Sequence, residues 1–143
     1  MFIRCRKFER YMFVSESSGV LYVVATPIGN LADMVPRAVE TLQSVDLIAC
    51  EDTRYSSRLL EHFRIETPTT AYHDHSDDRR VQKLIERLQA GQNLALISDA
   101  GTPLVSDPGF KLVRAVRDAG FKMVPIPGAC AFVAALSVAG LPS

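Results

Sequence analysis

At 143 residues the chain is long enough for one domain, and with 48% hydrophobic and 22% charged residues it has the composition of a globular protein rather than a disordered or collagen-like one. Its 16 basic and 16 acidic side chains give a net charge of zero, which argues against a polybasic nucleic-acid-binding protein. No apolar stretch reaches the ~20 residues that span a bilayer, and the three cysteines form no CxxC pair, so we expect a cytoplasmic protein without membrane association, disulfide framework or zinc knuckle.

The first 18 residues differ in composition from the rest of the chain. They are basic and lead into the linker-like run Ser15–Gly19. They contain no apolar core or cleavage site of a secretory signal. We expect residues 1–18 to be a flexible extension, or Met12 to be the biological start, and residues 19–143 to form one α/β domain.

From Val20 onward, a short apolar run, a loop and a helical segment follow one another five times. The predicted strands are Val20–Ala25, Asp46–Cys50, Thr69–Tyr72, Leu94–Ser98 and Met123–Ile126. Their apolar residues are mostly continuous, which is typical of strands buried on both faces of a parallel sheet. The pattern predicts an α/β fold with a mostly parallel five-stranded sheet flanked by helices.

Start and stop signals define the helices between these strands. We expect Asp33 to cap a helix over Pro36–Ser44, because proline is tolerated in a first turn. The amphipathic run Val81–Ala90 predicts a second helix that ends at Gly91. A further helix is expected over Phe110–Ala119.

The last predicted helix, Ala129–Ala139, has no polar face. A helix that is apolar on all sides is normally buried. Two alternatives follow: other helices of the same domain cover it, or a second subunit or a second domain does.

Loops rich in small and polar residues follow the predicted strands. Because ligands bind at the carboxyl ends of parallel strands, these loops predict one shared site. They are Thr26–Asn30, Glu51–Arg54, Tyr72–His75, Ser98–Gly109 and Pro127–Cys130. The chain contains no GxGxxG, GxxxxGK[ST] or GxSxG motif, which argues against NAD-type, Walker-type and serine-hydrolase sites.

The longest of these loops, Ser98–Gly109, is the most informative. It contains two Asp, two Gly and two Pro residues and exceeds the usual length of a strand-to-helix loop. Gly101 has no Cβ, so a ligand can approach the backbone there. The loop therefore favours a binding role, with an idle, well-capped connection as the alternative.

Four motifs in order carry a family resemblance. They are Val23–Leu31, Ala49–Arg54, Ser98–Gly109 and Pro125–Ala131. Together they resemble the tetrapyrrole methylase superfamily, and most closely its branch that transfers a methyl group from S-adenosylmethionine (SAM) to the ribose 2′-hydroxyl of a cytidine in 16S rRNA. The resemblance covers about residues 20–143. It implies an N-terminal α/β domain of a two-domain, homodimeric enzyme, with the C-terminal domain absent and SAM bound between the domains.

The resemblance also implies which residues contact SAM. They are Pro27, Ala100, Gly101, Thr102, Val105, Cys130 and Ala131. Small residues admit a flat adenosine, and free amides at a helix N-terminus bind polar or anionic atoms. We expect Cys130 to be a compact packing residue rather than a reactive thiol.

The methyl acceptor is weakly acidic, so a nearby base would increase the rate. Asp52 and Asp99 are the candidate catalytic residues. An alternative for Glu51 and Asp52 is Mg²⁺ coordination, and an alternative for Asp52 and Thr53 is capping of a helix over Arg54–Phe63.

Substrate contacts are expected at Asn30, Glu51, Arg54 and His73. His73 and His75 alternate on an extended segment and would point to opposite faces, so we expect no metal there. Phosphate contacts are one interpretation of Arg54, Arg58 and the pair Arg79–Arg80. The alternative is that they are only solvated, as exposed arginines on helices often are.

The expected partner is 16S rRNA in the small ribosomal subunit. Two other functions remain as alternatives: a porphyrinoid or other small-molecule methylase of the same superfamily, and a non-catalytic nucleotide-binding module. The motifs Thr26–Leu31 and Glu51–Arg54 resemble the rRNA branch more closely.

Overall fold

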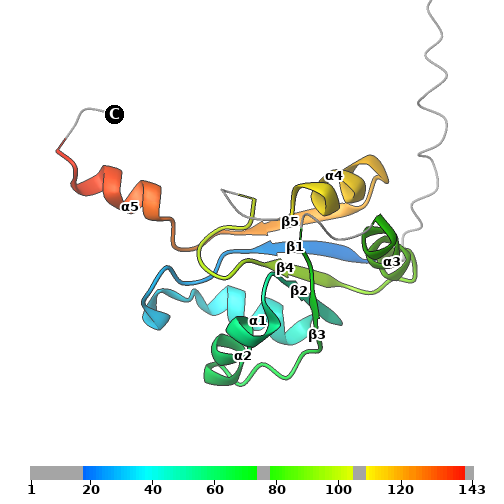
Figure 1. Cartoon of the computed structure of the whole chain (residues 1–143), viewed down its shortest axis with the longest axis horizontal. Coiled ribbons are helices and arrows are strands. Elements are labelled where there is room, and N and C mark those ends of the chain that lie inside the picture. The colour runs from blue at the N-terminus through cyan, green and yellow to red at the C-terminus, as the bar shows by residue number, and fades with distance from the viewer. Residues whose placement is uncertain (1–17, 74–77, 105–108, 141–143) are drawn as a thin grey trace, which may run out of the picture.

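A computed structural model describes residues 18–73, 78–104 and 109–140 (Figure 1). Its sheet consists of β1 (Val20–Val24), β2 (Leu47–Cys50), β3 (Thr69–Ala71), β4 (Leu94–Ile97) and β5 (Lys122–Ile126). The strand order is β3-β2-β4-β1-β5, and all four neighbouring pairs are parallel. The predicted α/β fold with a five-stranded parallel sheet is confirmed, whereas the predicted N-terminal extension lies, apart from Ser18, outside the described residues.

Helices cover both faces of the sheet. They are α1 (Pro36–Ser44), α2 (Thr53–His62), α3 (Asp78–Gln89) and α4 (Phe110–Asp118), followed by α5 (Ala131–Val138). Helices α3 and α4 lie on one face, and α1 and α2 lie on the other (Figure 1). The sheet is therefore the middle of three layers.

The continuous apolar strands supply both cores at once. In β4, Leu94 and Leu96 belong to the core under α3 and α4, while Ala95 and Ile97 belong to the core under α1 and α2. Successive side chains of a strand point to opposite faces, so a strand buried on both faces has no polar position. Every residue of β4 is buried, and each Leu contributes about 2 kcal/mol relative to an exposed one.

The start of α1 differs from the prediction. Asp33 does not cap it but lies in a short 3-10 helix, η2 (Leu31–Asp33), which begins at Asn30. The Oδ1 atom of Asn30 accepts a hydrogen bond from the Ala32 amide at 3.0 Å. Helix α1 starts after Val35 without a side-chain cap, because the Val35 side chain has no acceptor, and Pro36 at the first position reduces the number of unpaired amides by one.

The last helix shows the largest difference. All eight residues of α5 are exposed, with Phe132 at 72% and Val138 at 85%, and it projects away from the sheet (Figure 1). The expectation that this domain's own helices cover it is therefore wrong for the described residues. Coverage by a second subunit or domain stays a prediction.

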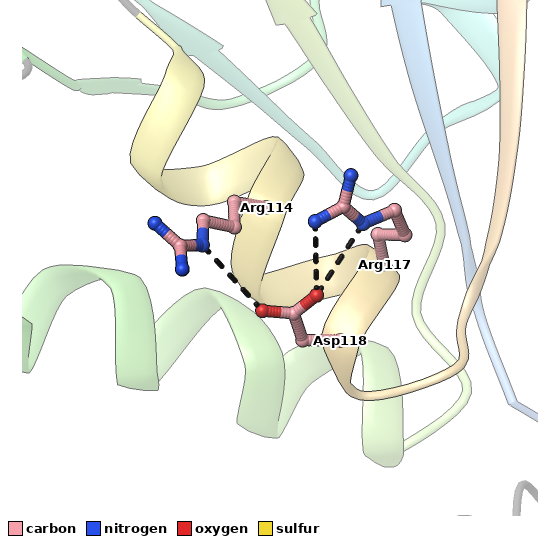
Figure 2. Close-up of polar contacts among 3 residues, drawn as sticks. All are labelled: Arg114, Arg117 and Asp118. Atoms are coloured by element: carbon pink, nitrogen blue, oxygen red, sulfur yellow. Dashed lines mark hydrogen bonds and ion pairs between the residues drawn. The ribbon is translucent and has the colours of Figure 1, made fainter.

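Helix α4, in contrast, is amphipathic and has a charged outer face. Figure 2 shows Asp118 between two arginines, with Arg114 Nε at 3.7 Å from Oδ2 and Arg117 Nη2 at 3.1 Å from Oδ1. Such exposed ion pairs contribute at most about 0.5 kcal/mol each.

Among the described residues, no helix has both the length and the apolar character needed to cross a membrane.

Candidate functional site

The loops that follow the strands leave the same edge of the sheet, because all strands run in one direction. This confirms the predicted common edge for the described parts of these loops. Residues 74–77 and 105–108, which include the expected SAM contact Val105, lie outside the described residues.

The first loop and the long loop are joined by a two-residue antiparallel bridge between Thr26 and Gly101. The Thr26 amide donates to the Gly101 carbonyl at 2.8 Å, and the Gly101 amide donates to the Thr26 carbonyl at 3.1 Å. The Thr26 hydroxyl, which is buried, also donates to the Ser98 carbonyl at 3.2 Å. Two of the predicted cofactor-binding segments are thus fixed against each other.

The conformation of Gly101 explains why glycine stands in this bridge. Its φ is +83°, in the left-handed region where a Cβ is unfavourable. A Cβ there would also lie 3.3 Å from Cγ2 of Ile28. The long loop therefore presents bare backbone next to the first loop.

The loop after β5 packs closely against the end of β1. A Cβ on Gly128 would lie 3.0 Å from Cβ of Ala25, so only a small residue fits this position. Two residues later, Cys130 precedes α5 and makes no side-chain cap, and Ala131 is the exposed first residue of the helix. Because the Cys130 side chain does not cap the helix, the first-turn amides of α5 are available to a ligand.

A pocket of about 200 Å³ opens between the first loop, α2 and the end of β4. Its lining residues are Thr26, Pro27, Gly29, Asn30, Leu31, Tyr55, Ser56, Arg58, Leu59, Ser98 and Asp99. Three predicted site residues, Pro27, Asn30 and Asp99, meet here. Ala100, Gly101 and Thr102 follow directly in the long loop but are not among the lining residues.

Sequence reasoning missed Tyr55, Ser56 and Leu59 as pocket residues. They lie on α2, whose face toward the pocket is set by how the helix packs against the first loop. One signal was present: Tyr55 and Leu59 are spaced by four residues, so they form an apolar pair on one face of the helix, where Tyr55 is 53% exposed. Arg58, predicted only as an alternative phosphate contact, also faces this pocket.

The hydroxyl of Ser56 is a buried polar group without a hydrogen-bond partner of ordinary geometry among the described residues. The thiol of Cys50 is its neighbour, but a thiol is only a weak partner. Burial raises the pKa of Cys50, nearby Asp99 and Asp52 raise it further, and Ser56 offsets part of this. Cys50 therefore stays protonated at neutral pH, while Ser56 retains an unused hydrogen bond.

The two candidate catalytic carboxylates have different surroundings. Asp52 is exposed, and its Oδ1 accepts the Arg54 amide at 2.8 Å, so the alternative that it caps α2 is confirmed. Asp99 is half-buried in the pocket lining, and its Oδ1 accepts the Asp52 amide at 3.3 Å. The Asp52 side chain thus caps α2, and the Asp52 amide positions the Asp99 carboxylate.

The four predicted substrate residues are only partly gathered. Asn30 lines the pocket, whereas Glu51 and Arg54 lie at the start of α2 and His73 is exposed beyond β3. In the ranges that the structure covers, no three His, Cys, Asp or Glu side chains form a group that would hold a metal.

Comparison with known proteins gives a consistent result. The family model described as tetrapyrrole (corrin/porphyrin) methylases matches residues 20–143. The chain is 63% identical over 123 residues to a Synechocystis sp. protein named ribosomal RNA small subunit methyltransferase I, covering 86% of this chain and 44% of the relative. A protein of the same name from Escherichia coli O157:H7 is 55% identical over 135 residues, 94% of this chain and 47% of the relative. The chain thus spans less than half the length of these relatives.

Solved structures support the fold. Uroporphyrin-III C-methyltransferase from Thermus thermophilus superimposes with a TM-score of 0.63 at 22% identity, covering 87% of this chain and 53% of that one. A cobalt-precorrin-4 methyltransferase gives a TM-score of 0.65 at 17% identity, covering 82% and 49%.

Proposed function

The chain belongs to the tetrapyrrole methylase family, and from that premise we propose that it forms part of a SAM-dependent enzyme that methylates a cytidine ribose 2′-hydroxyl in 16S rRNA. One observation carries the proposal: identity of 55–63% over most of the chain to relatives named ribosomal RNA small subunit methyltransferase I. The porphyrin and corrin methyltransferases resemble this chain only in fold, at 17–22% identity.

The residues at the sheet edge fit SAM. Ala100 is exposed and Thr102 is half-buried, so the long loop offers small side chains there, while the buried Gly101 between them is fixed by the bridge to Thr26. On the other side, Cys130 and Ala131 place the uncapped first turn of α5 where a ligand carboxylate can accept hydrogen bonds. When bound, SAM supplies an electrophilic methyl group on a positively charged sulfur.

Asp99 is the group we assign as the base. It lines the pocket, and the Asp52 amide holds one of its oxygens, which leaves the other to accept a proton. In this assignment Asp99 would accept the proton of the ribose hydroxyl when its oxygen takes up the methyl group that SAM would supply. A positioned base of this kind contributes about 10²- to 10⁴-fold.

The acceptor nucleotide occupies the pocket of about 200 Å³ beside Asp99 in this proposal. Tyr55 offers a partly exposed ring, and Arg58 and Asn30 offer polar groups at the rim. The Ser56 hydroxyl is buried behind this pocket next to the Cys50 thiol, so the exposed polar groups of Arg58 and Asn30 are the ones offered to the acceptor. Holding the oxygen in line with the methyl group is the larger contribution to rate.

Methyl transfer from radiolabelled SAM tests the function directly. The protein, with this chain extended to the full length of its relatives, is offered purified small ribosomal subunits and, separately, uroporphyrinogen. We expect label in the 2′-O position of the rRNA and none in the porphyrinoid. Label only in the porphyrinoid would overturn the substrate class, and tighter binding of ATP than of SAM in calorimetry would indicate a nucleotide-binding module.

Gly101→Val tests the cofactor site. The added side chain would strain the backbone and press against Ile28 of the first loop, which should displace the two loops, so SAM affinity should fall while circular dichroism keeps the α/β spectrum. Gly140→Ala is the control, since Gly140 lies outside the pocket and its backbone also has positive φ, but nothing lies within 4 Å of an added Cβ. Unchanged SAM affinity in Gly101→Val would remove the long loop from the site.

A further inference from the structure

A second groove, of about 380 Å³, lies between the edge strand β3 and helix α3. Its lining residues are Leu47, Pro68, Thr69, Thr70, Ala71, Tyr72, Arg80, Lys83, Leu84 and Arg87. Three of them are cationic and none is acidic. In a chain with zero net charge, this β3–α3 groove is a local concentration of positive charge.

The three cations form a row on one face of α3. Arg80, Lys83 and Arg87 are spaced by three and four residues, so they stack on successive turns and span about 10 Å along the helix. A strand within a duplex carries one phosphate about every 3.4 Å along its axis. The row is therefore long enough to face two or three consecutive phosphates.

Two of the cations are held in place by neutral partners. Arg80 Nη1 donates to the Ala71 carbonyl at 2.7 Å, and Arg87 Nη1 donates to Oε1 of Gln92 at 3.1 Å. A guanidinium has five N–H donors, so each keeps others for a ligand. Lys83 has no hydrogen bond or ion pair within the described ranges, and its ammonium is free to bind.

Acidic side chains of the same helix are used elsewhere. Glu86 accepts a hydrogen bond from Gln82 at 3.3 Å, and Asp78 lines a different groove, between α3 and α4. That α3–α4 groove also holds Lys111 and Arg114, but it mixes them with acids, and Arg114 pairs with Asp118 (Figure 2). Among the described residues that line the two grooves, acidic side chains therefore occur on the α4 side of α3 and not on its β3 side.

We propose that the β3–α3 groove binds the phosphate backbone of the RNA substrate, away from the methylated nucleotide; this rests on the proposed function. One end of the groove is formed by Tyr72, which directly follows β3, and by Arg80. This end lies at the carboxyl ends of the strands, where the candidate site also lies. The hydroxyls of Thr69 and Thr70 add donors of the kind that contact phosphate and sugar. The groove would thereby fix the orientation of the RNA without reading its sequence.

Salt dependence of RNA binding tests this groove. The chain with Lys83→Ala and Arg87→Ala is compared with wild type for binding to fluorescein-labelled poly(U) across a range of KCl concentrations. Removing two contacts should lower the slope of log K against log[salt] by about 1.4 and the affinity at 0.1 M salt by about 20-fold. The matched control, Lys111→Ala with Arg114→Ala, removes the same charge from α4 and should leave the slope within about 0.3 of wild type.

The possible results separate this proposal from the proposed function. Equal slopes for wild type and the Lys83/Arg87 variant, an equal effect in the Lys111/Arg114 control, or no wild-type binding to poly(U) would each overturn the groove. Polyglutamate binding more tightly than poly(U) would replace RNA by an acidic protein partner. Binding to poly(U) requires no methyl transfer. If the Lys83/Arg87 variant has a smaller slope of log K against log[salt] but the full-length protein transfers no methyl group to small ribosomal subunits, the groove is supported as an RNA-binding site and the proposed substrate is overturned.

Discussion

Helices α4 and α5 each follow a strand at the same edge of the sheet, yet they end in opposite environments. Helix α4 buries Leu112 and Val116 completely in the core and turns its charged residues outward. Helix α5 is apolar on every side, and all of its residues are exposed. An amphipathic helix completes its burial within its own domain, whereas a uniformly apolar one requires another surface to cover it.

The largest expected effect comes from truncating a buried side chain of α4. Leu112→Ala should lower the free energy of unfolding by about 3 kcal/mol, since it removes a fully buried side chain from the core under α3 and α4. Leu136→Ala on α5 is the matched control, because the same truncation at an exposed site should cost less than about 0.5 kcal/mol. Urea denaturation at low protein concentration measures both. Similar losses would mean that α5 is buried in solution.

The second prediction concerns what covers α5. We expect the chain to self-associate through this helix, and Phe132→Ser with Val133→Ser should raise the dissociation constant about 30-fold, which equals about 2 kcal/mol. Sedimentation velocity over a concentration series gives the constant. A wild-type chain that sediments as a monomer at every concentration would leave α5 to a different partner.

A smaller effect separates the two ends of α5. Ala131→Asp places a negative charge in the first turn, where we propose that the SAM carboxylate binds, and should weaken SAM binding about tenfold, or about 1.4 kcal/mol. Ala134→Asp places the same charge one turn later and should have little effect. Calorimetry on the protein extended to the full length of its relatives compares them, and equal losses would argue against a ligand at this helix start.

The smallest expected effect lies on the charged face of α4. Asp118→Asn removes both ion pairs with Arg114 and Arg117, which are more than half exposed, and should change the free energy of unfolding by less than about 1 kcal/mol. The remaining difference should vanish in 1 M NaCl. A larger, salt-resistant loss would show that this face is covered.

The sheet was predictable because its signal is local. A strand such as Leu94–Ile97, apolar at every position, fits only a sheet that is covered on both sides. The start of α1 was not predictable in the same way. Asp33 and Asn30 are both good capping residues, and only the folded loop shows that Asn30 caps a separate short helix. Local sequence ranks capping residues but does not determine where a turn of 3-10 helix intervenes.

The site residues in loops were predictable from the sequence, whereas those that reach the pocket through helix packing were not. Pro27, Asn30 and Asp99 stand in loops whose composition already indicated binding. Tyr55 and Ser56 reach the pocket only because α2 lies beside the first loop, a long-range arrangement. The exposure of α5 depends on surfaces beyond its own sequence, so both alternatives were open until its position was known.

The place of β1 in the sheet has a consequence for the order of folding. It is the first strand of the chain, yet its neighbours are β4, at Leu94–Ile97, and β5, at Lys122–Ile126. The contact between Thr26 and Gly101 closes a loop of 75 residues. Such non-local contacts form slowly, because chain entropy must be lost before they stabilise anything. During synthesis β1 has neither of these sheet partners until β4 has emerged, so we expect the ligand-binding end of the sheet to form late in folding.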